Sequence, residues 1–271
     1  MLNGKQYLRL NVLGKGGSSC VYLVLSDSGA LYAYKRVEVH GSDESADSVL
    51  DSYVNEIKLL NSLKGSSHII QLIDSAVSRE EMSIAMVLEA GDIDLARVLS
   101  RGHYGFTNKG KEGGKHSSSS ISNPFFLRTV WGEMLEAVDY IHDNRIVHGD
   151  LKPANFVFVR GHLKLIDFGI AKAMSNDTTN IYRDSQVGTI NYMAPEAISP
   201  MVDCGSTDVD VSFGDSDEKR KLKMRLGRPS DIWSLGCILY QMLYGKTPFS
   251  ALNTIQKLHA IPNPKYEILF P

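Results

Sequence analysis

The sequence has few cysteines, no long apolar run and no excess of one charge, and each shortage excludes a class of protein. Its three cysteines, Cys20, Cys204 and Cys237, are too few and too widely spaced for a disulfide framework or a CxxC zinc site. The longest uncharged apolar stretch, residues 232–245, is shorter than the roughly 20 residues that span a bilayer. We therefore expect an intracellular protein without a membrane span.

The charge balance excludes a further class. The chain has 29 basic and 31 acidic residues, a net charge of −2, which argues against direct nucleic-acid binding. With 43% hydrophobic and 22% charged residues, the composition is that of an ordinary globular protein. The 271 residues are enough for one compact domain or two small lobes with a substantial core.

Strand patterns dominate the first ninety residues, and helical patterns follow. Short apolar runs bounded by glycine or polar residues predict strands over 7–14, 21–25, 31–37, 69–73 and 83–88, and one helical pattern covers 51–64. Further on, Asn123 and Pro124 form a cap and first-turn signal before an apolar stripe, and another helix is predicted over 231–243. This order predicts an α+β fold.

Two segments interrupt these patterns and are predicted to be surface insertions. Residues 101–122 are rich in glycine, lysine and serine, so they bury too little apolar area to order themselves. Residues 200–228 pass from an acidic to a basic run, which fits either a solvated loop or a docking or nuclear-import signal.

A glycine-rich turn lies between the first two predicted strands, in the sequence GKGGSSCV at residues 14–21. Glycines allow backbone N–H groups to approach phosphate oxygens without a Cβ in the way. The turn departs from GxGxxGxV because Ser19 stands where the third glycine is expected. A strand follows it where a dinucleotide-binding Rossmann site needs a helix.

A lysine and a glutamate both fall on faces that are predicted to be buried. Lys35 shares the apolar side of its strand with Leu31, Ala33 and Val37. Glu56 lies beside the apolar stripe of the predicted helix. Taken singly, Lys35 would be expected to reach solvent and Glu56 to lie at the edge of its helix. A buried ammonium needs a partner, however, and together with the glycine-rich turn these two charges are predicted to form an ion pair.

The densest group of chemically active residues is HGDLKPAN at 148–155, followed by DFG at 167–169. Asp150, Asn155 and Asp167 offer hard oxygen atoms beside two strand-like runs. Such atoms suit Mg²⁺, which binds one or two carboxylates together with substrate phosphates. One carboxylate then stays free to accept a proton.

With these motifs the sequence resembles a eukaryotic protein kinase over nearly its whole length, with a β-rich N-lobe, one regulatory helix and a helical C-lobe. The resemblance implies lobes at 1–89 and 90–271 and assigns the catalytic residues as Asp150, Lys152, Lys35 and Glu56. It places Mg²⁺ on Asn155 and Asp167. It implies that ATP is bound by Leu13, Gly14, Lys15, Gly16, Gly17, Ser18, Ser19, Cys20, Val21, Ala33, Lys35, Leu88, Glu89, Gly91, Val157 and Asp167.

A narrower resemblance is to the monopolar-spindle checkpoint kinases. It rests on DSQVGTINYM at 184–193, GKTPF at 245–249 and KLHAI at 257–261. It implies dual specificity for serine or threonine and for tyrosine, and kinetochore proteins as substrates. It also implies a place in the nucleus and cytoplasm, with the kinetochore in mitosis, and transient self-association for autophosphorylation.

Two further features depart from the kinase pattern. Gly149 replaces the usual arginine before Asp150, so phosphate on the activation segment has no side-chain partner there. We still expect autophosphorylation at some of Thr178, Thr179 and Ser185. The C-lobe is expected to be incomplete, which would leave Glu196 without its usual arginine and lower stability.

A catalytically silent kinase-like module therefore stays as the alternative to an active enzyme. A small-molecule phosphotransferase is opposed by Ala194-Pro195-Glu196, which closes a segment that serves protein substrates.

Overall fold

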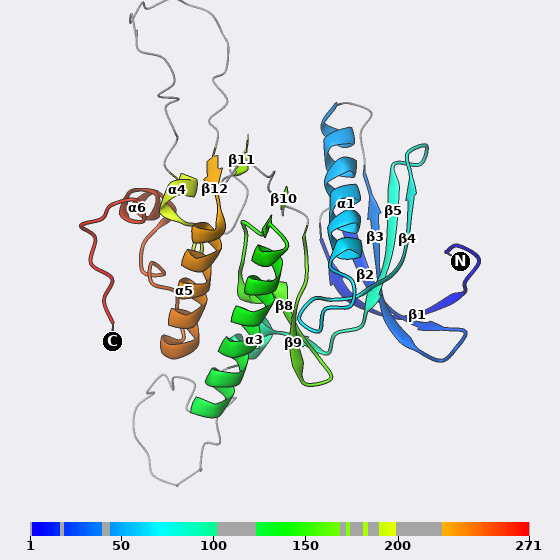
Figure 1. Cartoon of the computed structure of the whole chain (residues 1–271), viewed down its shortest axis with the longest axis horizontal. Helices are drawn as coiled ribbons and strands as arrows, with labels where there is room; N and C mark the ends of the chain where they lie inside the picture. The colour runs from blue at the N-terminus through cyan, green and yellow to red at the C-terminus, as the bar shows by residue number, and fades with distance from the viewer. Residues whose placement is uncertain are drawn as a thin grey trace, which may run out of the picture. The chain divides into compact units, whose positions relative to one another are not determined.

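The computed structural model describes separate stretches of the chain, which divide into two compact units (Figure 1). The first unit comprises Met1–His148 and Pro153–Ala173, and the second comprises Gly149–Lys152 and Met174–Pro271. The described stretches are residues 2–16, 19–39, 44–101, 123–168, 172–173, 181–183, 190–198 and 224–270. Within them, no helix combines the length and the apolar character that a membrane span requires.

An antiparallel sheet of five strands begins the first unit, in the order β1-β2-β3-β5-β4, so that β3 lies in the middle. Its β-branched and aromatic residues favour strands, and alternate residues face opposite sides. Along β3 the alternation buries Ala33 and Val37 and leaves Glu38 exposed. The strands are β1 (Tyr7–Lys15), β2 (Ser19–Ser26), β3 (Leu31–Glu38), β4 (Leu72–Ser78) and β5 (Ser83–Glu89).

Helix α1 (Glu44–Ser62) packs against β4 and β5. Ile57 and Leu60 are buried on its apolar side, and Glu56 is only 1% exposed. The helix begins earlier than the sequence predicts, at Glu44 rather than at residue 51, because the polar first turns carry no apolar stripe.

The strand predicted over residues 69–73 is wrong at its start, since β4 begins at Leu72. The backbone of residues 68–70, just before β4, forms hydrogen bonds with Leu165 instead. Ile70 N–H donates to the carbonyl of Leu165 at 3.0 Å, and Leu165 N–H donates to the carbonyl of His68 at 2.8 Å. These bonds join the first sheet to a second one within the same unit.

The second sheet has the strand order β6-β8-β9. Beside it, α3 (Pro124–Asp143) begins as predicted, with the Asn123 side chain accepting hydrogen bonds from the N–H groups of Phe125 and Phe126. Strand β7 pairs with β10. The remaining elements of this unit are β6 (Ile93–Asp94), α2 (Leu95–Ser100), β7 (Ile146–Val147), the 3₁₀ turn η1 (Pro153–Asn155), β8 (Phe156–Val159), β9 (His162–Leu165) and β10 (Lys172–Ala173).

The second unit is built around α5 (Arg228–Tyr244), whose buried residues include Leu235, Ile238 and Met242. Gly245 ends the helix with a φ of 72°, a left-handed conformation that favours glycine. Strand β11 pairs with β12, and α6 carries a capping box of Asn253 and Gln256. The other elements are β11 (Ile181–Arg183), α4 (Pro195–Ile198), β12 (Met224–Leu226) and α6 (Thr254–Ala260).

Two sequence boundaries differ from this division. The two units do not divide at residue 89, and the predicted lobe boundary there stays a prediction. The insertion expected over 200–228 overlaps two regular elements at its C-terminal end. Met224–Leu226 forms β12, and α5 begins at Arg228. Residues 102–122 and 199–223 lie outside the described residues.

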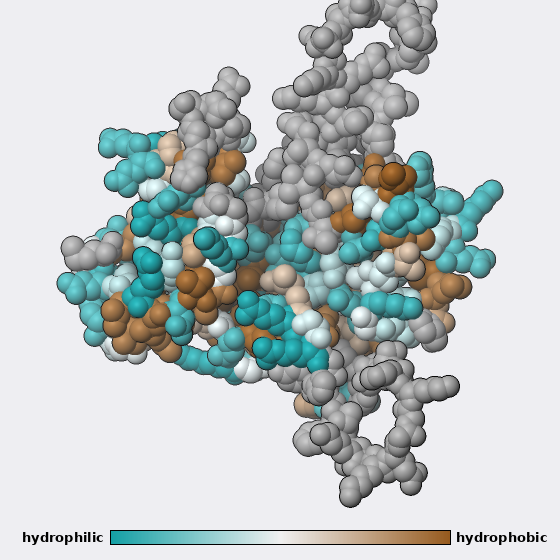
Figure 2. Space-filling view, turned by 180° about the vertical axis from the view of Figure 1, so that it is seen from behind, coloured by the Kyte–Doolittle hydropathy of each residue, from teal (hydrophilic) through white to brown (hydrophobic). Residues whose placement is uncertain are grey.

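Polar side chains cover most of the described surface in the view of Figure 2, and apolar ones lie among them in separate groups. Exposed apolar residues include Leu8 and Val12 on β1 and Ile255 on α6. Scattered exposure of this kind is usual for folded domains, because polar groups cannot cover the whole surface.

The core between α1 and the first sheet predicts a large cost for Leu60→Ala. Leu60 is 1% exposed, so its truncation leaves a cavity, and we expect the free energy of unfolding to fall by about 2–5 kcal/mol. Leu8→Ala on β1 is the matched control, because Leu8 is 64% exposed. Urea unfolding of both variants measures the difference, and equal losses would contradict this account of the core.

Candidate active site

The first unit contains a cleft of about 530 Å³, a size typical of small-molecule sites. Strands β1, β2 and β3, helix α1, the segment after β5, and the region of β8 and β9 all contribute to it. Most of the predicted nucleotide-binding residues line this cleft. They are Leu13, Gly14, Ser19, Val21, Ala33, Lys35, Leu88, Glu89, Gly91, Val157 and Asp167, and the predicted catalytic residue Glu56 lines the cleft with them.

Some predicted residues lie elsewhere. Lys15, Gly16 and Cys20 are described but do not line the cleft. Gly17 and Ser18 lie outside the described residues. The sequence analysis did not assign a further part of the lining, which comes from α1, from the segments before β4 and after β5, and from the region of β8 and β9. The missed residues are Val49, Ser52, Tyr53, Ile70, Asp92, Ile93, Asp94, Arg97, Ala154 and Ile166.

The structure shows the ion pair that the sequence predicts. Lys35 Nζ lies 2.9 and 3.0 Å from the two carboxylate oxygens of Glu56, and their side chains are 14% and 2% exposed. Lys35 also lies 4.9 Å from the centre of the Tyr53 ring. Strand β3 and helix α1 thus place an ammonium group, held by a buried carboxylate, at the wall of the cleft.

Burial and charge act in opposite directions on this pair. Burial favours the neutral form of Lys35, but attraction to Glu56 and Asp167 outweighs it and raises the pKa of Lys35 above its ordinary value. Burial raises the pKa of Glu56, and Lys35 opposes that rise. Lys35 is therefore a cation at neutral pH, able to bind an anion in the cleft.

A hydrogen-bond network fixes the segment after β5. Glu89 N–H donates to the carbonyl of Gln71 at 2.9 Å, and Lys164 Nζ donates to the Glu89 carboxylate at 2.7 Å. The Gln71 side chain donates to the carbonyls of Ser66 and Ile69 at 2.8 and 2.9 Å. These bonds hold the backbone that borders the cleft, and no sequence motif predicted them.

Asn155 and Asp167 provide oxygen atoms that fit a divalent metal ion. Asp167 lines the cleft, and Asn155 Oδ1 is buried with no hydrogen-bond partner among the described residues. Ile166 N–H donates to the Asn155 carbonyl at 2.7 Å, which ties Asn155 to the residue before Asp167. The described residues contain no cluster of three or more histidine, cysteine or acidic residues that could hold a metal ion. One amide and one carboxylate oxygen suit Mg²⁺ with phosphate ligands.

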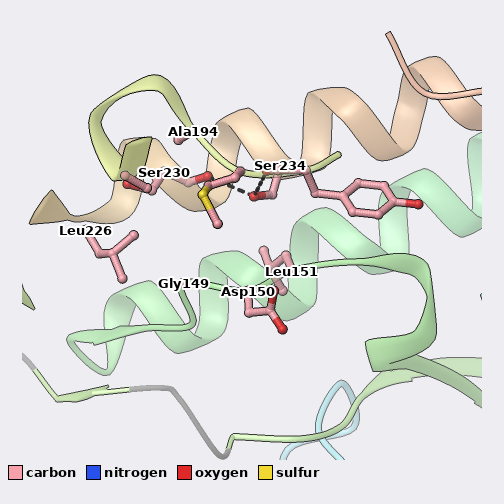
Figure 3. A pocket seen from close by; sticks show the side chains of 10 residues that line it. Gly149, Asp150, Leu151, Ala194, Leu226, Ser230 and Ser234 are labelled. Carbon is pink, nitrogen blue, oxygen red and sulfur yellow. Dashed lines mark hydrogen bonds between the residues drawn. The ribbon is translucent and has the colours of Figure 1, made fainter. Parts of the chain in front are cut away.

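The second unit holds Asp150 and Lys152, whose side chains form an ion pair of 2.6 Å. Gly149 has a φ of 75°, a conformation that glycine adopts readily, and its N–H donates to Oδ1 of the fully buried Asp231 at 2.8 Å. Figure 3 shows Gly149, Asp150 and Leu151 across a small pocket from α5. Its volume of about 10 Å³ has room for about one water molecule.

Glu196 is not left unpaired, contrary to the expectation from the sequence. Ser230 Oγ donates to Glu196 Oε1 at 2.7 Å and accepts from the Gly227 N–H at 3.1 Å. A hydroxyl group on α5 therefore satisfies the carboxylate that closes the Ala194-Pro195-Glu196 motif.

Tyr192 anchors the backbone just before this motif. Its hydroxyl donates to Gln241 at 2.6 Å, and Ser234 Oγ donates to its carbonyl at 2.7 Å. Burial raises the pKa of Tyr192 to about 12, so the hydroxyl stays protonated. The proposed phosphorylation sites Thr178, Thr179 and Ser185 lie outside the described residues.

Residues 7–268 match the protein kinase domain family, so the chain belongs to that family. The α+β bilobal kinase fold expected from the sequence is confirmed, and the family uses ATP with a divalent metal.

Similar proteins narrow the family further. The chain is 48% identical over 267 residues to serine/threonine-protein kinase mph1 of Schizosaccharomyces pombe, covering 98% of the chain and 35% of mph1. It is 46% identical over 272 residues to dual specificity protein kinase TTK of Mus musculus, and the match covers 100% of the chain and 28% of TTK. It is 41% identical over 271 residues to serine/threonine-protein kinase MPS1 of Saccharomyces cerevisiae, and the match covers 100% of the chain and 32% of MPS1. The chain thus spans about a third of the length of these relatives, and the predicted resemblance is confirmed.

Gly91 borders the cleft so closely that no larger residue fits. A Cβ at this position would lie 1.9 Å from Val157 Cγ1, so we expect Gly91→Ala to lower stability by about 1–3 kcal/mol and to weaken nucleotide binding. Adding Val157→Ala should restore part of both losses, whereas Gly132→Ala, which meets no atom within 4 Å, should cost nothing. Calorimetry of the variants with and without ADP tests this, and full binding by Gly91→Ala alone would contradict it.

The bond between Ser230 and Glu196 predicts that Ser230→Ala destabilises the second unit. Removing the hydroxyl leaves the Glu196 carboxylate without this donor, at an expected cost of about 1–3 kcal/mol. In a Glu196→Ala background the same change should cost much less. Thermal unfolding of the four proteins of this cycle measures the coupling, and purely additive effects would show that the bond contributes nothing.

Proposed function

We propose that this chain is the catalytic domain of an ATP-dependent protein kinase that modifies serine and threonine and also tyrosine hydroxyls. The observation that carries the proposal is the Lys35–Glu56 ion pair at the wall of the 530 Å³ cleft, with Asp167 lining the same cleft. A fixed positive charge at this wall suits the phosphates of a nucleotide. Membership of the protein kinase family supports it.

Different residues of the cleft bind the base, the phosphates and the metal ion of Mg²⁺-ATP. Val21, Ala33 and Val157 give the cleft apolar walls that suit a planar base. Lys35 binds the α- and β-phosphates, and Glu56 keeps Lys35 in place. Asn155 and Asp167 would hold Mg²⁺, which supplies charge neutralisation of the phosphate oxygens when bound.

The catalytic loop supplies the groups for phosphoryl transfer. Asp150 accepts the proton of the substrate hydroxyl as its oxygen forms a bond to the γ-phosphorus. The bond from that phosphorus to the bridging oxygen breaks, and ADP leaves with the electron pair. Lys152, which lies 2.6 Å from Asp150, steadies the charge on the transferred group. The chemistry is mostly positioning and charge stabilisation.

The proposed cellular role is in spindle-checkpoint signalling. Kinetochore and checkpoint proteins are its proposed substrates, and the nucleus, cytoplasm and mitotic kinetochore its proposed locations. Support comes from the monopolar-spindle motifs of the sequence and from the similarity to mph1, TTK and MPS1. Transient self-association is proposed for autophosphorylation.

Incubation with Mg²⁺-ATP tests the enzymatic proposal directly. We expect intact-mass spectrometry to show added phosphates, and peptide mapping to place some of them on Thr178, Thr179 or Ser185. Asp150→Asn should slow the modification by about 100-fold or more, because the proton acceptor is lost. Asp139→Asn, on the exposed side of α3, is the control with the same charge change. This variant should gain phosphate at the rate of the parent protein.

The outcomes separate an enzyme from a silent module. If folded protein gains no phosphate with Mg²⁺-ATP, transfers none to a protein substrate, and still binds the nucleotide, the chain is a kinase-like binding module. If the parent and the Asp150→Asn variant gain phosphate at the same rate, Asp150 is not the proton acceptor.

A further inference from the structure

A second concavity lies on the other side of the first sheet from the cleft. Its volume is about 220 Å³. Alternate residues of β3 face the two sites, since Ala33 and Lys35 line the cleft while Tyr34 and Arg36 line this concavity. We name it the Tyr–Arg pocket, defined by Tyr7, Arg9, Tyr22, Val24, Tyr34 and Arg36.

Strand pairing brings these side chains to one face. Arg9 on β1 pairs with Val24 on β2, and Tyr22 on β2 pairs with Tyr34 on β3. The Arg9 guanidinium lies over the Tyr22 ring, with its carbon 4.1 Å from the ring centre, and this cation–π contact helps to hold it at the wall of the pocket. The Tyr7 ring lies 6.4 Å from the Tyr34 ring. The pocket is therefore built from contacts between three strands.

The lining offers hydrogen-bond donors and no carboxylate. Two guanidinium groups and three phenol hydroxyls surround the space. Arg9 forms no ion pair with the residues that the structure describes. Arg36 pairs with Glu38 at 2.8 Å, but both side chains are 52% exposed, and surface pairs of this kind are weak and easily exchanged. The pocket thus favours a compact anion with several acceptor oxygens.

We propose that the Tyr–Arg pocket binds the phosphate group of a phosphorylated side chain on another protein. A phosphomonoester carries nearly two negative charges and three acceptor oxygens, which match two guanidinium groups and adjacent hydroxyls. The volume of about 220 Å³ is below that of sites for drug-sized ligands, so it suits one phosphorylated side chain.

The surroundings disfavour an extended polyanion. Glu38 stands beside Arg36, and the chain as a whole has a net charge of −2. Nucleic acid and anionic membranes need a wide basic surface to gain affinity from released counterions or surface potential. The proposed site is independent of phosphoryl transfer, because it shares no residue with the cleft or with the Asp150 loop.

Fluorescence anisotropy tests the proposal with a fluorescein-labelled glycine peptide that carries one central phosphoserine. The full chain is saturated with Mg²⁺-ADP, so that the cleft cannot bind the probe. We expect saturable binding, weakened about tenfold or more by Arg9→Ala and by Arg36→Ala. Arg79→Ala removes an arginine that is 64% exposed and paired with Asp51, and it should leave the affinity unchanged.

A second variant protects the test against loss of folding. Arg9→Lys keeps the charge but not the planar fork of donors, so it should weaken binding while the unfolding temperature stays unchanged. Equal affinity of the parent and both alanine variants would overturn the proposal. Equal binding of the same peptide with aspartate in place of phosphoserine would also overturn the proposal. So would a chain that does not bind the phosphopeptide but binds phosphatidylserine vesicles through Arg9 and Arg36.

Discussion

The ion pair between Lys35 and Glu56 is the contact on which the site depends. Two opposite charges are removed from water here, and burial of either one alone would be strongly unfavourable. Their partnership requires β3 in the middle of the sheet and α1 packed on β4 and β5. The packing that buries Glu56 also brings it to Lys35, so the fold of this unit positions the ion pair of the site.

Buried and half-buried polar groups elsewhere in the site also have partners. Glu89 is held by Lys164, and Glu196 by Ser230. Asp231, fully buried in α5, accepts the Gly149 N–H and so fixes the residue before Asp150. Asn155 Oδ1 has no such partner among the described residues, so this oxygen is available for the metal ion that we propose there.

Short-range patterns were enough to predict much of this from the sequence. Alternation along β3 placed Lys35 toward the core, and the cap at Asn123 located the start of α3. Apart from the ion pair of Lys35 and Glu56, the following contacts between distant segments have no local sequence signal. The pairing of Ile70 with Leu165 moved the start of β4, and the Ser230–Glu196 bond joins residues far apart in the chain. The Tyr–Arg pocket likewise needs the register of three strands, which no single segment encodes.

The most direct test of the central claim is a double-mutant cycle of Lys35→Met and Glu56→Gln, read on the affinity for Mg²⁺-ATP. If the pair positions Lys35 for the phosphates, each single change weakens binding and the double change adds little. The expected coupling is about 0.5–3 kcal/mol. Additive effects, or a Glu56→Gln protein that binds Mg²⁺-ATP like the parent, would contradict the claim that this ion pair organises the site.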